Sequence, residues 1–206
     1  MTENQRSPRR LAIFASGAGT NTQQIIGHFR NSQSVKIALV ATNNPSAGVL
    51  DIARRESIPT LVLDKHRFYQ GDGYLDQLQA GGIDFIILAG FLWKIPLSLI
   101  RAFLLRMVNI HPALLPKFGG KGMYGHHVQE AVLAAKESQS GITVHFVDEW
   151  YDHGQILFQA LCRIAEGESA ASLADKIHVL EHTHFPKVVE LVAGLQNIVK
   201  RSPEEL

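Results

Sequence analysis

Residues 11–21 read Leu11-Ala12-Ile13-Phe14-Ala15-Ser16-Gly17-Ala18-Gly19-Thr20-Asn21. The run begins with five apolar residues, which is typical of a parallel strand that is buried on both faces. It then changes to a polar turn with two glycines. A helical pattern follows, whose apolar face carries Ile25, Ile26 and Phe29. Strand, glycine turn and helix in this order predict the first unit of a Rossmann-like α/β fold.

The rest of the first half repeats this alternation. Further strands are expected at residues 35–41, 61–63, 84–89 and 107–110. Helical patterns lie between them, at residues 47–57, 74–80 and 98–103. Strands separated by helices imply right-handed crossovers, and therefore a mostly parallel sheet.

The second half has a different pattern. A loop with four glycines at 117–125, a helix at 128–136 and a half-buried alternating strand at 142–147 are expected. The run at 155–164 follows after a short loop, so these two strands should be antiparallel. Ser169 is expected to cap a long final helix. We expect a single domain over residues 1–206, with an N-terminal half at about 1–108 and a C-terminal half at about 109–206.

The composition is that of an ordinary globular protein. The chain has 206 residues, of which 46% are hydrophobic and 19% charged, so a core can form without disulfides. A net charge of +1 argues against a nucleic-acid partner. The single cysteine, Cys162, fits a reducing cytoplasm, and the polar first ten residues do not resemble a signal peptide. No run approaches the roughly 20 apolar residues that a membrane span needs.

The turn at Ser16–Asn21 is a candidate anion site. Glycines allow close approach of the backbone, and free N–H groups at a helix start attract an anion such as phosphate. The turn lacks the lysine of a phosphate-binding Walker loop. It also fails the dinucleotide pattern Gly-x-Gly-x-x-Gly, because residue 22 is threonine. The alternative is a tight turn with a structural role only.

Asn109-Ile110-His111-Pro112 ends the fifth expected strand. Asn109 and His111 are two residues apart, so both side chains point to one side of the strand. Ligands bind beyond the carboxyl ends of strands in such sheets, although a strand-end histidine can also be purely structural. Asp152 lies in a later loop, where it either forms a turn or pairs with His111. In the second case we expect it to raise the pKa of His111 and keep the imidazole cationic.

These segments together resemble the folate-dependent formyltransferases, and among them the family that formylates glycinamide ribonucleotide. The matching pieces are Ser16–Asn21, Leu88-Ala89-Gly90-Phe91, Asn109-Ile110-His111-Pro112-Ala113-Leu114-Leu115-Pro116-Lys117, Gly141-Ile142-Thr143-Val144-His145-Phe146-Val147 and Asp152-x-Gly154. They occur in family order over nearly the whole chain. The Asn-Ile-His-Pro segment is shared by all folate formyltransferases, whereas the Ser-Gly-x-Gly-Thr-Asn turn singles out the ribonucleotide enzymes.

The resemblance implies a Rossmann-like formyltransferase fold and transfer of a formyl group from 10-formyltetrahydrofolate to the ribonucleotide amine, without a metal. Asn109, His111 and Asp152 match the family's catalytic positions. The substrate phosphate and ribose positions correspond to Gly19, Thr20, Asn21, His178 and Glu181. The folate positions correspond to Arg67, Phe91, Leu92, Trp93, Lys94, Ile95, Asn109, Tyr151 and Asp152.

The resemblance also implies how the reaction proceeds. Asn109 and a cationic His111 would stabilise the oxyanion formed when the amine attacks, and Asp152 would assist proton transfer. The chain departs from the family pattern at His178, where glutamine is common, and at Trp93-Lys94. Its loop at 118–127 is also richer in glycine than usual; it either closes over substrates or is a flexible connector.

Three alternatives remain open from the residues. His178-Val179-Leu180-Glu181-His182 spells an inverted zinc-protease motif. A formyltetrahydrofolate hydrolase would use the same Asn109, His111 and Asp152 but would need no phosphate turn. A nucleotide-binding Rossmann module is the third alternative. The expected partners are small molecules in the cytoplasm, and a monomer and a homodimer fit the sequence equally well.

Overall fold

The computed structural model describes residues 7–70 and 74–199, with side chains described as far as residue 194. The chain divides into two compact units, Met1–Met107 and Val108–Leu206. Each unit is built around its own group of strands, and each is described by itself below.

The first unit contains a parallel sheet in the order β3-β2-β1-β4. Its strands are β1 (Arg9–Phe14), β2 (Val35–Thr42), β3 (Thr60–Val62) and β4 (Phe85–Leu88). Every residue of β4 is buried, as are the last four residues of β1. Continuous burial is what an apolar strand covered on both faces requires. The parallel strands predicted from the sequence are therefore confirmed.

Among the described residues, four helices connect these strands and a fifth follows β4. They are α1 (Thr20–Phe29), α2 (Val49–Arg55), α3 (Lys65–Tyr69), α4 (Leu75–Ala80) and α5 (Leu97–Ala102). The apolar face predicted for α1 is buried, and α1 and α2 pack against each other and against β2. Helix α3 was not predicted. It begins at Asp64, whose carboxylate accepts a hydrogen bond from the Arg67 backbone N–H (2.8 Å).

The strand order creates a topological switch point beside β1. The chain runs outward from β1 to β3 and then returns to place β4 on the other side of β1. Right-handed crossovers carry the connections on the two sides of β1 over opposite faces of the sheet. The two connections therefore diverge beyond the carboxyl ends of β1 and β4, where ligands bind in such folds. The glycine turn follows β1 at this point, and the segment from Gly90 to Ile95 follows β4.

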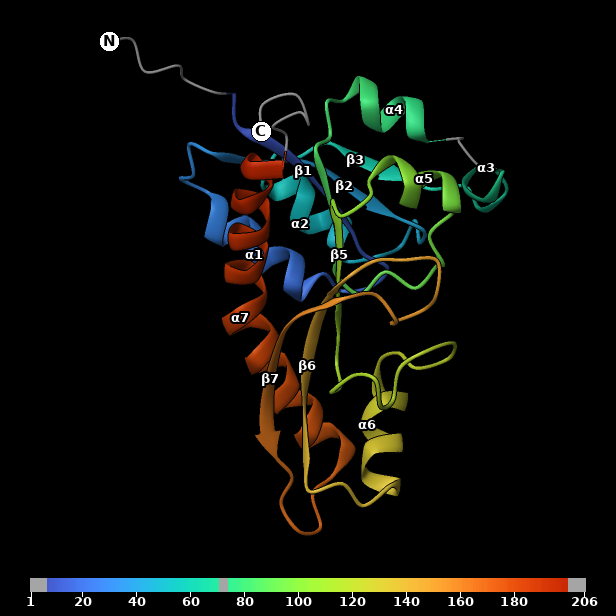
Figure 1. Cartoon of the computed structure of the whole chain (residues 1–206), viewed down its shortest axis with the longest axis vertical. Helices are drawn as coiled ribbons and strands as arrows, with labels where there is room; N and C mark the ends of the chain where they lie inside the picture. Colours follow the sequence, from blue (N-terminus) through green and yellow to red (C-terminus); the bar gives the residue numbers. More distant parts are fainter. Residues whose placement is uncertain (1–6, 71–73, 200–206) are drawn as a thin grey trace. The chain divides into compact units, whose positions relative to one another are not determined.

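The second unit contains three antiparallel strands (Figure 1). These are β5 (Met107–His111), β6 (Gln139–Phe146) and β7 (Ile156–Arg163). Helix α6 (His126–Ala134) precedes β6, and the long α7 (Ala170–Val199) packs along β6 and β7. Ser169 caps α7, as predicted, by accepting a hydrogen bond from the Ser172 N–H (3.2 Å). Within the described residues, no helix has both the length and the apolar character needed to cross a membrane.

Strand β6 differs from its prediction. Its alternating pattern predicted a strand with one exposed face, but every residue from Ser140 to His145 is buried. One face carries Ile142 and Val144 in the apolar core. The other carries Thr143, whose hydroxyl donates to the carbonyl of Ala113 (2.7 Å) and accepts from the N–H of Leu115 (3.0 Å). The turn that follows His111 therefore covers the polar face, so its polar residues are buried and hydrogen-bonded.

We predict opposite effects for two glycine-to-alanine substitutions. In Gly141→Ala, the new Cβ would lie 2.0 Å from the carbonyl oxygen of Ala160 on β7, so the paired strands must separate. In Gly27→Ala, on the exposed face of α1, nothing lies within 4 Å of the new Cβ. Urea unfolding should show a loss of several kcal/mol for the first and a gain of about 0.5–1 kcal/mol for the second. Equal stabilities would contradict this account of the β6–β7 contact.

Candidate active site

Ser16 joins the loops at the switch point of the first unit. Its hydroxyl donates to Asn43 Oδ1 (2.6 Å) and accepts from the Leu92 N–H (2.9 Å). Its own N–H donates to the Gly90 carbonyl (3.0 Å). The glycine turn after β1, the end of β2 and the segment after β4 are thus held together at one edge of the sheet. Two segments predicted to bind substrate, the turn and the start of 91–95, are therefore neighbours.

The glycine turn is the N-terminus of helix α1. Gly19 is the N-cap residue and has a φ of +81°, which favours glycine. A Cβ at this position would lie 2.8 Å from the side chain of Val49, so the close packing also requires glycine. Thr20 and Asn21 are the first two residues of this ten-residue helix. The predicted anion turn therefore presents backbone N–H groups at a helix start, where the helix dipole also favours negative charge.

The folate positions predicted in the first unit lie around an aromatic cluster. Phe91 and Ile95 are buried, Trp93 is half-buried, and Leu92 and Lys94 are exposed. The rings of Phe91 and Trp93 both contact Phe68 of α3, with ring centroids 5.9 Å and 5.5 Å away. The Arg67 guanidinium lies over the Tyr74 ring, 4.4 Å from its centroid. Helix α3, which the sequence analysis missed, thus brings Arg67 to the same region as Trp93.

The three predicted catalytic residues meet in the second unit. Asn109 and His111 lie on β5, and Asp152 lies in the loop between β6 and β7. The Asp152 Oδ2 atom is 3.5 Å from His111 Nδ1, and its Oδ1 atom accepts a hydrogen bond from Asn109 Nδ2 (3.2 Å). Oδ2 also accepts a hydrogen bond from the Gly120 N–H (3.0 Å). The carboxylate therefore joins β5 to the glycine-rich loop.

His145 is a fourth member of this cluster, and the sequence analysis did not assign it a role. It is 2% exposed and pairs with Asn109 in the β5–β6 register. Its Nδ1 lies 2.8 Å from the Phe146 carbonyl oxygen, so Nδ1 carries a hydrogen. In the neutral ring, Nε2 then accepts a hydrogen bond from Asn109 Nδ2 (3.1 Å). The alternation in residues 142–147 was the available signal, but the register that sets His145 opposite Asn109 is not readable from one sequence.

His111 is held by the loop that follows β5. Its Nε2 lies 2.8 Å from the carbonyl oxygen of Phe118, so Nε2 carries a hydrogen and donates it. Phe118 has a φ of +56°, an unusual value for an aromatic residue. A Cβ on Gly119 would lie 2.5 Å from Leu115 and 3.2 Å from the Cβ of Asp152, so glycine is required there. The strained loop backbone is thus fitted closely around the imidazole and the carboxylate.

The expected cationic state of His111 is wrong for this conformation. Burial lowers the pKa of His111, and although the Asp152 charge and the Phe118 carbonyl raise it, the net shift is downward. Burial raises the pKa of Asp152, but its interactions with His145, His111 and the Gly120 N–H outweigh burial, so that pKa is lowered. Near neutral pH the cluster therefore contains an ionised Asp152 and an uncharged His111.

The remaining predicted residues of the second unit lie on α7 and beside Asp152. His178 is exposed and Glu181 is buried. The rings of His178 and His182 stack with centroids 6.1 Å apart. Over the described ranges, the only group of three metal-ligating side chains with ligand atoms within 4.8 Å of one another lies on α6, so the zinc-protease motif of α7 does not form a three-ligand cluster. Tyr151 is exposed next to Asp152.

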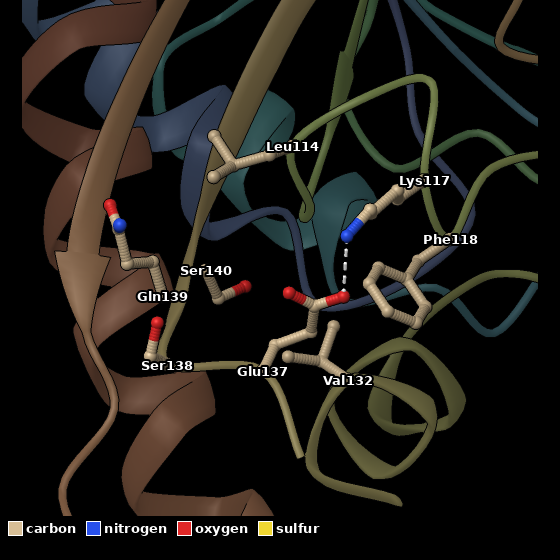
Figure 2. A pocket seen from close by; sticks show the side chains of 8 residues that line it. All are labelled: Leu114, Lys117, Phe118, Val132, Glu137, Ser138, Gln139 and Ser140. Atoms are coloured by element: carbon tan, nitrogen blue, oxygen red, sulfur yellow. Dashed lines mark hydrogen bonds and ion pairs between the residues drawn. The ribbon is translucent and has the colours of Figure 1, made fainter. Parts of the chain in front are cut away.

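A separate pocket of the second unit is lined in part by the Phe118 side chain (Figure 2). Its volume is about 260 Å³, and a Lys117–Glu137 ion pair (2.7 Å) crosses it. Its lining is formed by Leu114, Lys117, Phe118, Val132, Glu137, Ser138, Gln139 and Ser140. As far as the described residues go, this lining includes none of the predicted site residues. One of its lining residues, Phe118, also holds His111 through its carbonyl.

A half-buried carboxylate and amide beside a buried imidazole at a strand end form a site suited to acyl-group transfer, and the first unit of the same chain carries an anion turn. The protein-family model of the formyl transferases matches residues 9–189, so the chain belongs to the formyl transferase family. Phosphoribosylglycinamide formyltransferase of Bacillus subtilis is 31% identical over 92% of this chain and 97% of its own length.

Two further comparisons agree with this family. The chloroplastic phosphoribosylglycinamide formyltransferase of Arabidopsis thaliana is 41% identical over 90% of this chain. The chain spans 66% and 60% of the lengths of the two plant relatives that it matches. The crystal structure of glycinamide ribonucleotide transformylase 1 from Symbiobacterium toebii superposes with a TM-score of 0.84 at 30% identity, covering 94% of this chain and 92% of that one. The predicted formyltransferase fold is therefore confirmed.

We predict that Asp152→Asn lowers the pKa of His111 further. The Asp152 charge is the largest influence that raises this pKa, and the amide replaces it without a change of shape. Imidazole NMR titrations of both proteins should show the shift, with the exposed His66 as an internal control. A His111 pKa that rises, or does not change, would contradict the assignment of Asp152 as its charge partner.

Proposed function

We propose that this chain transfers the formyl group of 10-formyltetrahydrofolate to the amine of glycinamide ribonucleotide, a step of purine biosynthesis. The observation that carries the proposal is the hydrogen-bonded cluster of the buried His111 and His145 with the half-buried Asn109 and Asp152. Membership of the formyl transferase family and the names of the relatives and solved structures support it. The anion turn of the first unit supports a phosphorylated acceptor rather than water.

The hydrogen-bond donors of the cluster are all in use before substrate arrives. Asn109 has two amide hydrogens, and these point to His145 and Asp152. The Nε2 hydrogen of His111 points to Phe118. For either residue to stabilise an oxyanion, one of these bonds must be exchanged for a bond to the formyl oxygen. Loss of one such donor typically costs about 10²–10³ in rate.

A neutral His111 is suited to receive a proton. Its Nδ1 bears a lone pair that faces the ionised Asp152 carboxylate across 3.5 Å. When the amine nitrogen attacks the formyl carbon, the nitrogen becomes positively charged and must lose a proton. The His111–Asp152 pair accepts this proton, directly or through water, and returns it to the departing folate nitrogen. The carbon–nitrogen bond to the folate then breaks, and the formyl group remains on the ribonucleotide.

The binding residues are assigned from the resemblance to the formyltransferase family. Phosphate is assigned to the N-terminus of α1 at Gly19, Thr20 and Asn21 and to His178, and the ribose is assigned to Glu181. Folate is assigned to Arg67, Phe91, Leu92, Trp93, Lys94, Ile95, Asn109, Tyr151 and Asp152. The exposure of Leu92, Lys94 and Tyr151 leaves these side chains accessible to a ligand. The reaction as written needs no metal ion, since donors and the proton acceptor are side chains.

The domain organisation, the compartment, the oligomeric state and the partners of the chain are also proposals. One formyltransferase domain at 1–206 would have its phosphate-binding half at about 1–108 and its folate and catalytic half at about 109–206. We place the enzyme in the cytoplasm because its one cysteine fits a reducing compartment, although the plant relatives are named as chloroplastic. A monomer or a homodimer, without nucleic-acid or membrane partners, remains the prediction.

The direct test mixes the full chain with 10-formyltetrahydrofolate in the presence and absence of glycinamide ribonucleotide. Deformylation is followed by the change in folate absorbance, and the formylated product by mass spectrometry. We expect turnover only with the amine present. Rapid deformylation without the amine would instead favour a hydrolase, and no deformylation in either mixture would contradict the proposal.

We predict that His111→Ala reduces kcat by at least about 10²-fold while the fold is retained, since it removes both a donor and the proton acceptor. Steady-state kinetics and circular dichroism measure the two effects. The exposed His28→Ala on α1 is the matched control and should keep normal turnover. Near-normal kcat in His111→Ala would exclude the proposed role.

We predict that Asn21→Asp raises KM for the ribonucleotide at least about tenfold with little change in KM for folate. A carboxylate about 4 Å from a phosphate is repelled by about 4 kcal/mol at an effective dielectric constant of about 20. Gln23→Glu is the control, because it adds the same charge two residues further along α1, on another side of the helix. Equal KM values for both variants would argue that phosphate binds elsewhere.

A further inference from the structure

The first two turns of α6 gather three metal-ligating side chains that the proposed reaction does not use. These are His126, His127 and Glu130, all exposed. One ligand atom from each lies within 4.8 Å of the other two. His127 Nδ1 is 3.6 Å from Glu130 Oε2, and the His126 and His127 ring centroids are 4.2 Å apart. The three side chains therefore share one side of the helix.

The helical spacing explains why these side chains converge. Glu130 lies four residues after His126 and three after His127, so it is one turn away from both on the same face. The ring of Tyr124 meets the ring of His127 edge to face, with centroids 5.6 Å apart and planes at 83°. That contact limits the positions of the His127 ring, so one of the three donors is partly oriented in advance.

We propose that His126, His127 and Glu130 form a binding site for a borderline divalent transition-metal ion such as Zn²⁺, Co²⁺ or Ni²⁺. Two imidazoles and one carboxylate are a donor set that zinc and non-haem iron sites use in proteins. Tetrahedral ligands about 2 Å from a metal are about 3.3 Å apart. The three groups need to approach one another by only about 1.5 Å, which exposed side chains do by small rotations.

The charge and the donor types select the class of ion. With neutral imidazoles, the carboxylate gives the site one negative charge, and exposure means that this charge carries no burial penalty. Mg²⁺ and Ca²⁺ prefer oxygen ligands, so a site with two nitrogens out of three discriminates against them. Three protein ligands also leave positions for water, which is the arrangement of an open metal site rather than a closed structural one.

The test uses the full chain after removal of metals with a chelator. Calorimetric titration with Zn²⁺ in a non-coordinating buffer should show one ion per chain, and equimolar Mg²⁺ should not displace it. Co²⁺ should give visible absorption bands whose intensity reports the same site. His126→Ala and His127→Ala should each weaken Zn²⁺ binding by at least about tenfold, and Glu130→Gln, which keeps the shape and removes the charge, should also weaken it.

The matched control is His153→Ala. His153 pairs with the Asp148 carboxylate (Nδ1–Oδ2 2.9 Å) on the surface, and within the described ranges no third metal-ligating side chain joins this pair, so this variant should bind Zn²⁺ normally. Thermal unfolding without metal should be the same for all variants, because the altered side chains are exposed. The proposal is overturned if the unaltered chain binds no ion, if the α6 variants bind like it, or if His178→Ala on α7 abolishes binding instead.

Discussion

The carboxylate of Asp152, which is only 11% exposed, is the group on which the order of the second unit depends. A charge removed from water must be compensated by hydrogen bonds or by opposite charge. Here two hydrogen bonds, from the Gly120 N–H and the Asn109 amide, provide the compensation, and the His111 and His145 rings lie 3.5 Å and 3.7 Å from the carboxylate. These partners belong to β5, β6 and the glycine-rich loop. Satisfying one carboxylate therefore fixes three segments that are far apart in the sequence.

The same compensation decides what the histidines can do. Asn109 donates one amide hydrogen to His145 and the other to Asp152, so the amide fixes the positions of these two side chains relative to each other. His111 is left with one donor, used by Phe118, and one lone pair facing the carboxylate. Burial keeps this imidazole uncharged although Asp152 lies beside it. A cluster arranged in this way is prepared to accept a proton rather than to donate one. The closeness of Asp152 to His111 alone would suggest the opposite, a cationic imidazole that donates.

Local patterns predicted most of the fold because they reflect burial along one element. Continuous apolar runs identified β1 and β4, and the apolar face of α1 was read from its helical spacing. Predictions were less accurate where the structure of a segment depends on contacts with residues far away in the sequence. The polar face of β6 is buried because Thr143 bonds to a distant turn, and α3 was missed because its five residues carry little periodic signal. His145 and the carbonyl of Phe118 were missed for a similar reason, since strand register and loop conformation bring them to the cluster.

Backbone strain beside the cluster follows from these requirements. Phe118 and Asp152 both have positive φ values, which cost about 1 kcal/mol or more in residues other than glycine. Both lie where a backbone or side-chain oxygen must face the His111 ring. Asp tolerates this conformation better than an aromatic residue does, so Phe118 bears the less favourable geometry. Its bond to His111 offsets that cost only while the imidazole donates to it. The imidazole and the strained backbone at residue 118 therefore stabilise each other in this conformation.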